Sequence, residues 1–229
     1  SVERGVMQPV GGPVDATPAL KPDGVLLRGR FGVVEKFDPE KHAASLWDAI
    51  EGDDELWTYM WQGPFARRED FFAFAGLLGR REDPFAYAIV DRSSNVLGVA
   101  TLMEIRPANR VIEVGGIFYS KTLRHTPLAT EAQYLLMRYA FEKLRYRRYE
   151  WKCDSLNAPS RRAAERFGFT FEGVFRQHMI VKNRNRDTAW FSITDTEWPR
   201  VKEAFERWLS PENFDAEGRQ KRKLQAHRT

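Results

Sequence analysis

Apolar residues recur every three or four positions after Thr126, which is the spacing of one buried face of an amphipathic helix. The positions with this period are Leu128, Ala132, Leu135, Leu136, Tyr139, Ala140 and Leu144. Thr126 is a good N-cap, and Pro127 is favoured at the first helical position, so the sequence predicts that the helix begins there. Similar patterns predict helices at residues 42–50, 67–80, 157–167 and 197–209.

Runs rich in β-branched and aromatic residues, separated by turn signals, predict strands. A β-rich segment at residues 25–37 precedes the first helix, and the runs at 85–91, 96–105 and 111–120 indicate a meander. Further strands are expected at 147–154, 169–181 and 187–193. The order of strands, long helix, strand, short helix and two strands predicts a mixed α/β sheet with helices on both faces.

The length of 229 residues and a hydrophobic content of 42% predict one domain with short appendages. We expect a Gly- and Pro-rich extended arm at residues 1–25, a folded domain at 26–210 and a basic tail at 211–229. The last eleven residues carry five Lys and Arg, so the net charge of +4 leaves −1 for the remainder (4 minus 5). A basic face for nucleic acid is therefore not expected, and the tail is predicted to be solvated and frayed, with an anionic partner as the alternative.

The sequence also bears on the compartment. One cysteine, Cys153, rules out an internal disulfide framework and a multi-cysteine metal site, and we expect no metal. Cys153 itself is expected to be a small buried hydrophobic residue. No apolar run is long enough for a membrane span, and the first residues lack the pattern of a signal peptide. A cytoplasmic protein without a membrane partner is the prediction.

The stretch LRHTPLATEA contains the start of the long helix and the first candidate site. The N–H groups of Leu128, Ala129 and Thr130 are free of helical partners there, and the helix dipole favours an anion beside them. Arg124 adds a positive charge. These residues alone leave two interpretations open, an anion site or ordinary helix capping.

Two longer patterns favour the first interpretation. Arg124-x-x-Pro127-x-Ala129 follows a glycine-bearing strand, and Asn157-x-x-Ser160 follows the next strand. Together with the element order, these motifs resemble the GNAT superfamily of acyl-CoA-dependent N-acetyltransferases, in particular its RimJ/RimL branch. The resemblance extends from Leu26 to Leu209, which is roughly 80% of the chain.

The resemblance implies a GNAT-like, mostly antiparallel sheet that is splayed at an acyl-CoA site, and acetyl-CoA as the co-substrate. It implies that Arg124 and the main-chain amides of the helix start bind the pyrophosphate. Those amides belong to His125, Thr126, Leu128, Ala129 and Thr130. Pro127 stands where the family has glycine, so that position supplies no donor.

The same resemblance implies that the acetyl thioester lies where the 111–119 strand separates from the 148–154 strand. Gly115 and Gly116 then indicate a bulge whose amides, with that of Ile117, face the thioester and pantetheine. The alternative is a bend that relieves crowding. Asn157 is implied either to contact the coenzyme, to cap the short helix, or both.

An alkylamine is mostly protonated at neutral pH, so direct transfer needs a proton acceptor. Relatives with ribosomal-protein substrates have a Glu at the position of Met179, which cannot act as a base. The remaining candidates are Glu113, which could instead be a solvated strand residue, and His178, which could be a structural histidine. Ser160 matches the position whose hydroxyl serves the departing sulfur in RimL-type members, or it caps its helix.

The acceptor is the least determined part. Trp57, Tyr59, Trp61 and Phe65 could line its pocket, although such a cluster can equally be core. The overall prediction is an N-acetyltransferase that moves acetyl to a primary amine by direct attack in a ternary complex. The amine would belong to a small molecule, an aminoacyl compound or a peptide N-terminus, and the chain would be a monomer or a homodimer. The alternative is a non-catalytic acyl-CoA sensor or partner-binding module.

Overall fold

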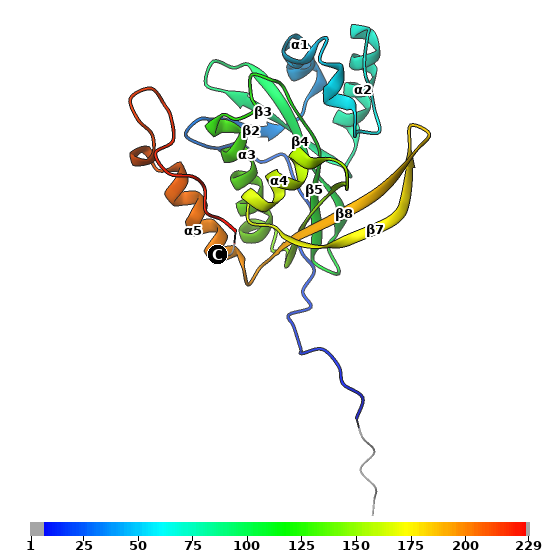
Figure 1. Cartoon of the computed structure of the whole chain (residues 1–229), viewed down its shortest axis with the longest axis vertical. Helices are drawn as coiled ribbons and strands as arrows, with labels where there is room; N and C mark the ends of the chain where they lie inside the picture. The colour runs from blue at the N-terminus through cyan, green and yellow to red at the C-terminus, as the bar shows by residue number, and fades with distance from the viewer. Residues whose placement is uncertain (1–6, 228–229) are drawn as a thin grey trace, which may run out of the picture.

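A computed structural model describes residues 7–227, and Figure 1 shows a twisted sheet with helices on both sides. The strands are β1 Leu27–Arg28, β2 Gly32–Lys36, β3 Phe85–Asp91, β4 Val96–Arg106, β5 Val111–Tyr119, β6 Arg148–Asp154, β7 Thr170–Val181 and β8 Arg184–Thr194. Their order is β1-β2-β3-β4-β5-β6-β8-β7. Only the β5–β6 pair among these is parallel, so the predicted mixed, mostly antiparallel sheet is confirmed.

The helices lie where the apolar periodicity predicts them. They are α1 Pro39–Ile50, α2 Arg68–Arg80, α3 Pro127–Arg138, α4 Ala158–Arg166 and α5 Trp198–Leu209, with the single turns η1 Asp54–Trp57, η2 Tyr139–Lys143 and η3 Pro211–Asn213. None of these helices, within residues 7–227, has the length and apolar character needed to cross a membrane.

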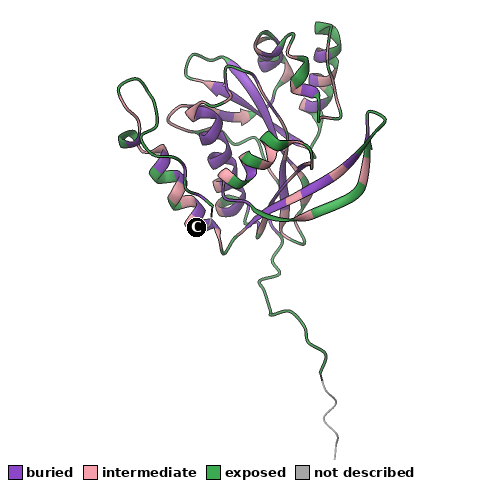
Figure 2. Ribbon diagram, in the orientation of Figure 1, coloured by how far each residue is buried: buried purple, intermediate pink, exposed green. Residues whose placement is uncertain are grey.

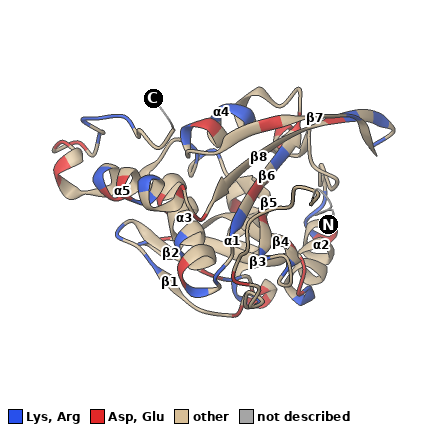
Figure 3. Cartoon of the chain, turned by 90° about the horizontal axis from the view of Figure 1, so that it is seen from below, with Lys and Arg blue, Asp and Glu red and all other residues tan. Residues whose placement is uncertain are grey.

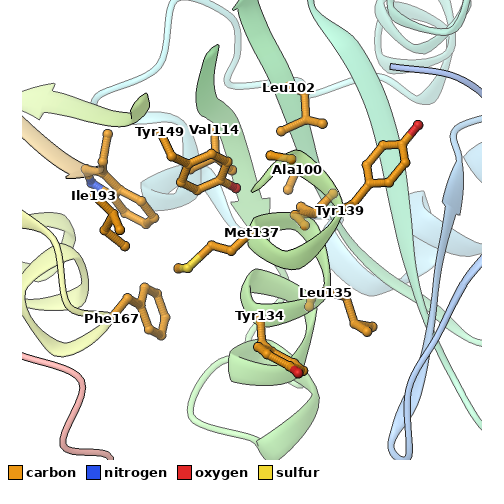
Figure 4. Close-up of a cluster of buried hydrophobic side chains, with 14 of the residues drawn as sticks. Ala100, Leu102, Val114, Tyr134, Leu135, Met137, Tyr139, Tyr149, Phe167 and Ile193 are labelled. Carbon is orange, nitrogen blue, oxygen red and sulfur yellow. The ribbon is translucent and has the colours of Figure 1, made fainter. Parts of the chain in front are cut away.

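Two hydrophobic clusters hold the helices to opposite faces of the sheet. Helices α3, α4 and α5 cover one face, where Met137 of α3 points between Tyr149 of β6 and Phe167 beyond α4 (Figure 4). Helices α1 and α2 cover the other face over β3 and β4, through residues such as Leu46 and Phe71. Within residues 7–227, no such helix lies over the α1/α2 face of β6, β8 and β7, and the exposed residues of β7 are visible in Figure 2.

The arm is extended and largely exposed over residues 7–25 (Figure 2), and its first six residues lie outside the described part of the chain. Its second half is attached to the domain. The amide of Ala19 donates to Pro107 O at 3.0 Å, and that of Leu20 donates to Leu144 O at 2.9 Å. The arm therefore begins its contacts with the domain before β1.

The C-terminal tail does not behave as predicted. It was expected to be solvated and frayed, yet Leu224 and Ala226 are 4% and 0% exposed and belong to the core under α3, α4 and α5. Arg200 donates to the carbonyl of Ala226, and that same carbonyl packs against Gly168, where a Cβ would come within 2.7 Å of it. Among the described residues of the tail, Arg219, Lys221, Arg222 and Lys223 are exposed while Leu224 and Ala226 are buried, which the charge count obscured.

Candidate active site

Strands β5 and β6 separate after three residue pairs, and this split is the centre of the candidate site. They pair at Val111–Arg148, Ile112–Tyr149 and Glu113–Glu150 and no further. Beyond the last pair, the facing edges of both strands carry main-chain groups without a strand partner. Such groups need hydrogen bonds from elsewhere, and an extended amide-bearing ligand can supply them.

A bulge in β5 lies just past the split. Between the pairs made by Val99 and Thr101 of β4, β5 contains one extra residue. Gly116 has a φ of +54°, in the left-handed region that glycine adopts most easily. The predicted bulge is present, and it takes the main chain of Gly116 and Ile117 out of the regular ladder.

The start of α3 combines a cap with free donors. The Thr126 side chain accepts the amide of Ala129 at 3.3 Å, and Pro127 occupies the first position, as the sequence predicts. The amide of Thr126 donates to Leu123 O at 3.2 Å, so two of the five predicted donors already have partners. Two amides, those of His125 and Leu128, have no hydrogen-bond partner among residues 7–227. Thr130 is the fourth residue of α3, where the amide makes the first helical hydrogen bond, so an anion fits His125 and Leu128 better than it fits the whole predicted set.

Arg124 lies at this helix start, but its guanidinium is already bound. Nη2 is 2.9 Å from Oδ2 of Asp53, and Nε donates to Tyr119 O at 3.0 Å. The Asp53 side chain is only 9% exposed, so this ion pair is well shielded. An anion at Arg124 would compete with Asp53, which the sequence did not reveal.

Glu113 is the last paired residue of β5, and its side chain is 3% exposed rather than solvated. Burial raises its pKa to about 7, although the Lys152 ammonium acts in the opposite direction. Lys152 Nζ lies 3.0 Å from Oε1, which is an ion-pair distance, but no well-aligned hydrogen bond from residues 7–227 reaches that oxygen. A carboxyl group that titrates near neutral pH can act as a general base.

His178 faces the same side of the sheet as Glu113, for a local reason. A register shift between Phe175 and Met179 of β7 breaks the normal alternation of faces. His178 Nδ1 then lies 2.7 Å from Oγ1 of Thr188, and its ring centre is 6.0 Å from that of Trp190. The histidine is therefore held by neighbours of its own hairpin.

Lys152 connects the two base candidates and was missed by the sequence analysis. Its ammonium contacts Glu113 and lies 5.2 Å from the centre of the Trp190 ring, against which His178 packs. The signal was present in the strand WKCD, because alternation puts Lys152 on the face opposite Trp151 and Cys153. Only the pairing of β6 with β5 and β8 shows which charges it meets.

Ser160 and Asn157 both have structural partners at the start of α4. The Asn157 side chain accepts the amide of Ser160 at 3.2 Å and so caps the helix. The Ser160 hydroxyl oxygen accepts Trp151 Nε1–H at 3.0 Å. The hydroxyl also hydrogen-bonds the Cys153 side chain, which lowers the pKa of that thiol against the larger, raising effect of burial. Their roles toward the coenzyme stay predictions.

The aromatic cluster divides into core and surface. Trp57 is 3% exposed and packs on Phe65 and Phe118, each at a ring-centre distance of 5.0 Å, so it belongs to the core and does not line a pocket. Tyr59 and Trp61 are 37% and 54% exposed and remain available to an acceptor.

Residues 53–66, here called the bridging loop, touch three other parts of the site. Besides the Asp53–Arg124 pair, the Tyr59 hydroxyl donates to Leu156 O at 3.3 Å, in the loop before α4. Lys182, at the tip of the β7–β8 hairpin, donates to Trp57 O at 2.7 Å and Gln62 O at 2.9 Å. The loop thus connects the helix start to the hairpin, whose tip is rich in Lys and Arg (Figure 3).

Two hollows of about 360 and 280 Å³ lie away from these residues. The larger is beside His42 and Glu35, and the smaller is between Arg30 and Glu131. His42 uses both ring nitrogens, toward Asp38 N and Glu35, so the larger hollow has no free catalytic group of that kind. The sheet split has the more suitable chemistry, because unpaired main chain and a perturbed carboxyl meet there.

The comparisons with known proteins agree with this geometry. A family model described as "Acetyltransferase (GNAT) domain" matches residues 33–170. A crystal structure of a GCN5-related N-acetyltransferase from Brucella melitensis is 48% identical, with a TM-score of 0.88, and the match covers 91% of this chain and 96% of that chain. The chain belongs to the GNAT acetyltransferase family.

The similar proteins include ones with ribosomal-protein acetyltransferase names. The curated "Putative ribosomal N-acetyltransferase YdaF" of Bacillus subtilis is 30% identical over 104 residues, which cover 45% of this chain and 56% of YdaF, little more than half its length. An acetyltransferase from Salmonella typhimurium that modifies the N-terminal serine of ribosomal protein L7/L12 shares the fold, at a TM-score of 0.65 and 19% identity, covering 74% of this chain and 99% of that chain. The predicted RimJ/RimL-like resemblance is confirmed.

Proposed function

We propose that the protein transfers an acetyl group from acetyl-CoA to a primary amine by direct attack in a ternary complex. The observation that carries the proposal is the buried Glu113 carboxyl at the sheet split, next to the Gly116 bulge. A base and unpaired main-chain groups lie together at this split, and the anion site at the start of α3 follows the other end of β5. This combination is what amine acylation from a diphosphate-bearing thioester requires.

The donor would be held by main chain more than by side chains. The amides of His125 and Leu128 would bind the pyrophosphate, and the amides of the bulge at Gly116 and Ile117 would bind the pantetheine and the thioester carbonyl. When bound, the thioester supplies the activated acetyl group. Asn157 would contact the coenzyme from the start of α4.

The chemical step uses Glu113 as the base, with His178 second. As the amine nitrogen bonds to the carbonyl carbon and the carbon–sulfur bond breaks, the amine proton passes to Glu113, directly or through a water. Coenzyme A leaves as a thiolate, to which the Ser160 hydroxyl would donate in place of the Cys153 sulfur, while its oxygen accepts from Trp151. Tyr59 and Trp61 would flank the acceptor.

A second candidate function is acyl-CoA binding without turnover. Two departures from the family pattern favour it: Met179 replaces the Glu of the ribosomal-protein enzymes, and Pro127 removes one amide donor. The Asp53–Arg124 pair adds to this, since it reduces the positive charge at the helix start.

The deciding experiment incubates the protein with acetyl-CoA and a panel of amines, amino acids and peptides, and follows acetylated products by mass spectrometry. The proposal expects at least one product and free coenzyme A in equal amount. Binding of acetyl-CoA with no acceptor acetylated would favour the sensor. The cytoplasmic location, and the choice between monomer and homodimer, stay predictions.

A further inference from the structure

The charges at the split determine what kind of amine can bind there. Glu113 and Lys152 are 3% and 13% exposed and form an ion pair in which the two charges cancel. The nearby Glu150 cannot neutralise Lys152, because Glu150 already binds Arg106 and also accepts Arg148 Nε at 3.0 Å. Among residues 7–227, Glu113 is the one acidic group in ion-pair contact with Lys152.

An acceptor amine arrives as an ammonium ion, and in the direct route it contacts Glu113 to lose its proton. The acceptor ammonium then competes with Lys152 for the Glu113 carboxylate, which is the group that neutralises Lys152. Two cations would face one anion in a poorly solvated place, and an uncompensated buried charge is strongly unfavourable. The acceptor therefore needs to bring an anion of its own next to its amine.

We propose that Lys152 binds a carboxylate carried by the acceptor, so that the substrates are α-amino acids with a free carboxyl group. In an α-amino acid one carbon atom separates the amine from the carboxylate, which suits the 3.0 Å contact between the Glu113 and Lys152 charges. The ammonium of the amino acid pairs with Glu113 and its carboxylate pairs with Lys152, so each of the four charges has a partner of opposite sign. This inference rests on the proposed acetyl transfer.

The surroundings of Lys152 favour an apolar amino-acid side chain. Its ammonium lies over Trp190, whose ring centre is 5.0 Å from that of Phe175. Phe175 is 54% exposed, so the pair presents an apolar surface that an acceptor can cover. The polar groups beside it, His178 and Thr188, already bind each other.

The test compares three probes that differ only at the carboxyl group: phenylalanine, phenylalaninamide and 2-phenylethylamine. Leucine, leucinamide and 3-methylbutylamine form a second set. With saturating acetyl-CoA, kcat/KM for each free amino acid should exceed that of its amide and its amine by about 10-fold or more, the equivalent of one lost charge-assisted contact.

Variants assign the preference to Lys152. Lys152→Met should reduce acetylation of phenylalanine and bring it level with the amide, whereas Lys152→Arg should keep the preference for the carboxylate. Lys202→Met is the matched control, because Lys202 also forms a 3.0 Å ion pair, with Glu142, but far from the split. Melting temperature and acetyl-CoA affinity of each variant report on folding and on the donor site.

Several outcomes overturn the inference. If Lys152→Met does not fold, the kcat/KM values of the wild-type protein for the amino acid, the amide and the amine decide the question. Equal or better turnover of the amide or the amine excludes a carboxylate requirement. A preference that persists in Lys152→Met excludes Lys152 as its source. If acetyl-CoA binds and other amines are acetylated while both amino acids are not, only the inference fails. If acetyl-CoA neither binds nor reacts, the proposed function fails as well.

Discussion

Glu113 has a carboxyl group that burial and one ammonium group influence in opposite directions. Burial is the stronger effect and raises the pKa to about 7, which keeps a fraction of the groups ionised at neutral pH. The carboxylate can then accept a proton from an amine and release it again. Its chemistry thus depends on a residue of another strand, Lys152, more than on its own sequence neighbours.

Replacing this carboxyl group gives the most direct test of the base. Glu113→Gln should lower kcat/KM by about 10²–10⁴-fold, the usual contribution of a general base, while acetyl-CoA binding is kept. Because the base acts as the carboxylate and its pKa lies at about 7, wild-type activity should fall as the pH drops through that value. The pH–rate profile should lose this limb in Glu113→Gln, with His178→Ala as the comparison. Loss of the limb in His178→Ala alone would reverse the two roles.

Ser160 allows a second residue-level prediction. Ser160→Ala should lower turnover more than acetyl-CoA affinity, because a hydroxyl at the sulfur matters most as charge develops on it. The substitution also leaves the buried Nε1–H of Trp151 without its partner, which costs about 1–3 kcal/mol. Trp151→Phe separates the two effects, since it removes the donor but keeps the hydroxyl. A similar loss of turnover in both variants would indicate a structural role only.

At this scale the sequence could supply candidates but not their partners. Glu113 was found because it shares a strand with Gly115 and Gly116, and strands alternate faces in a known way. Its pairing with Lys152 depends on the register of β5 against β6, which no local pattern encodes. The capping roles of Thr126 and Asn157 were predictable, since they involve only residues nearby in the chain.

Among the elements, the bridging loop connects the parts of the site, and its contacts were not predictable. Asp53 and Arg124 are far apart in sequence, and in the sequence Asp53 looks like an ordinary surface charge. The bulge in β7 decides which face His178 occupies, because it breaks the regular alternation of faces along the strand. Helix positions, by contrast, follow from periodicity, because each helix buries one continuous apolar face.

The ion pair of this loop can be tested from both sides. Arg124→Glu should weaken acetyl-CoA binding, because it removes a cation from the helix start and leaves Asp53 facing a like charge. Asp53→Asn should keep or increase the affinity, because Arg124 is then free for phosphate. Calorimetric titration with acetyl-CoA measures both, and Arg67→Glu is a control in an exposed ion pair elsewhere. Unchanged affinity in Arg124→Glu would mean that Arg124 serves the loop only.

At the scale of the whole molecule, the C-terminal tail differs from what its composition predicts. Its net charge predicted a solvated end, because five basic residues outweigh two apolar ones in any count. Leu224 and Ala226 are nevertheless the residues that complete the core beside α5. The fold class, in contrast, was predictable from the order of strands and helices, because the rules for connecting such elements leave few possible topologies.

The docked tail leads to a prediction for truncation. Deleting residues 219–229 should lower the melting temperature, since it removes Leu224 and Ala226 from the core. Leu224→Ala alone should cost about 2–5 kcal/mol, the usual range for a buried leucine. Lys221→Gln and Lys223→Gln change only exposed side chains and should leave chemical denaturation unaffected. A truncated protein as stable as the full chain would show that the tail contributes no net stability.

The contacts of the bridging loop have a kinetic consequence. Its Asp53 holds Arg124 at the helix start, while Trp57 and Gln62 hold Lys182 at the hairpin tip beside the acceptor face. A donor phosphate that binds Arg124 breaks the Arg124–Asp53 ion pair, which is one of the contacts that hold the bridging loop. The loop can then move away from the acceptor face only after the donor has bound. Initial-rate studies should therefore give a compulsory order of addition, acetyl-CoA first, and Asp53→Asn should make that order random.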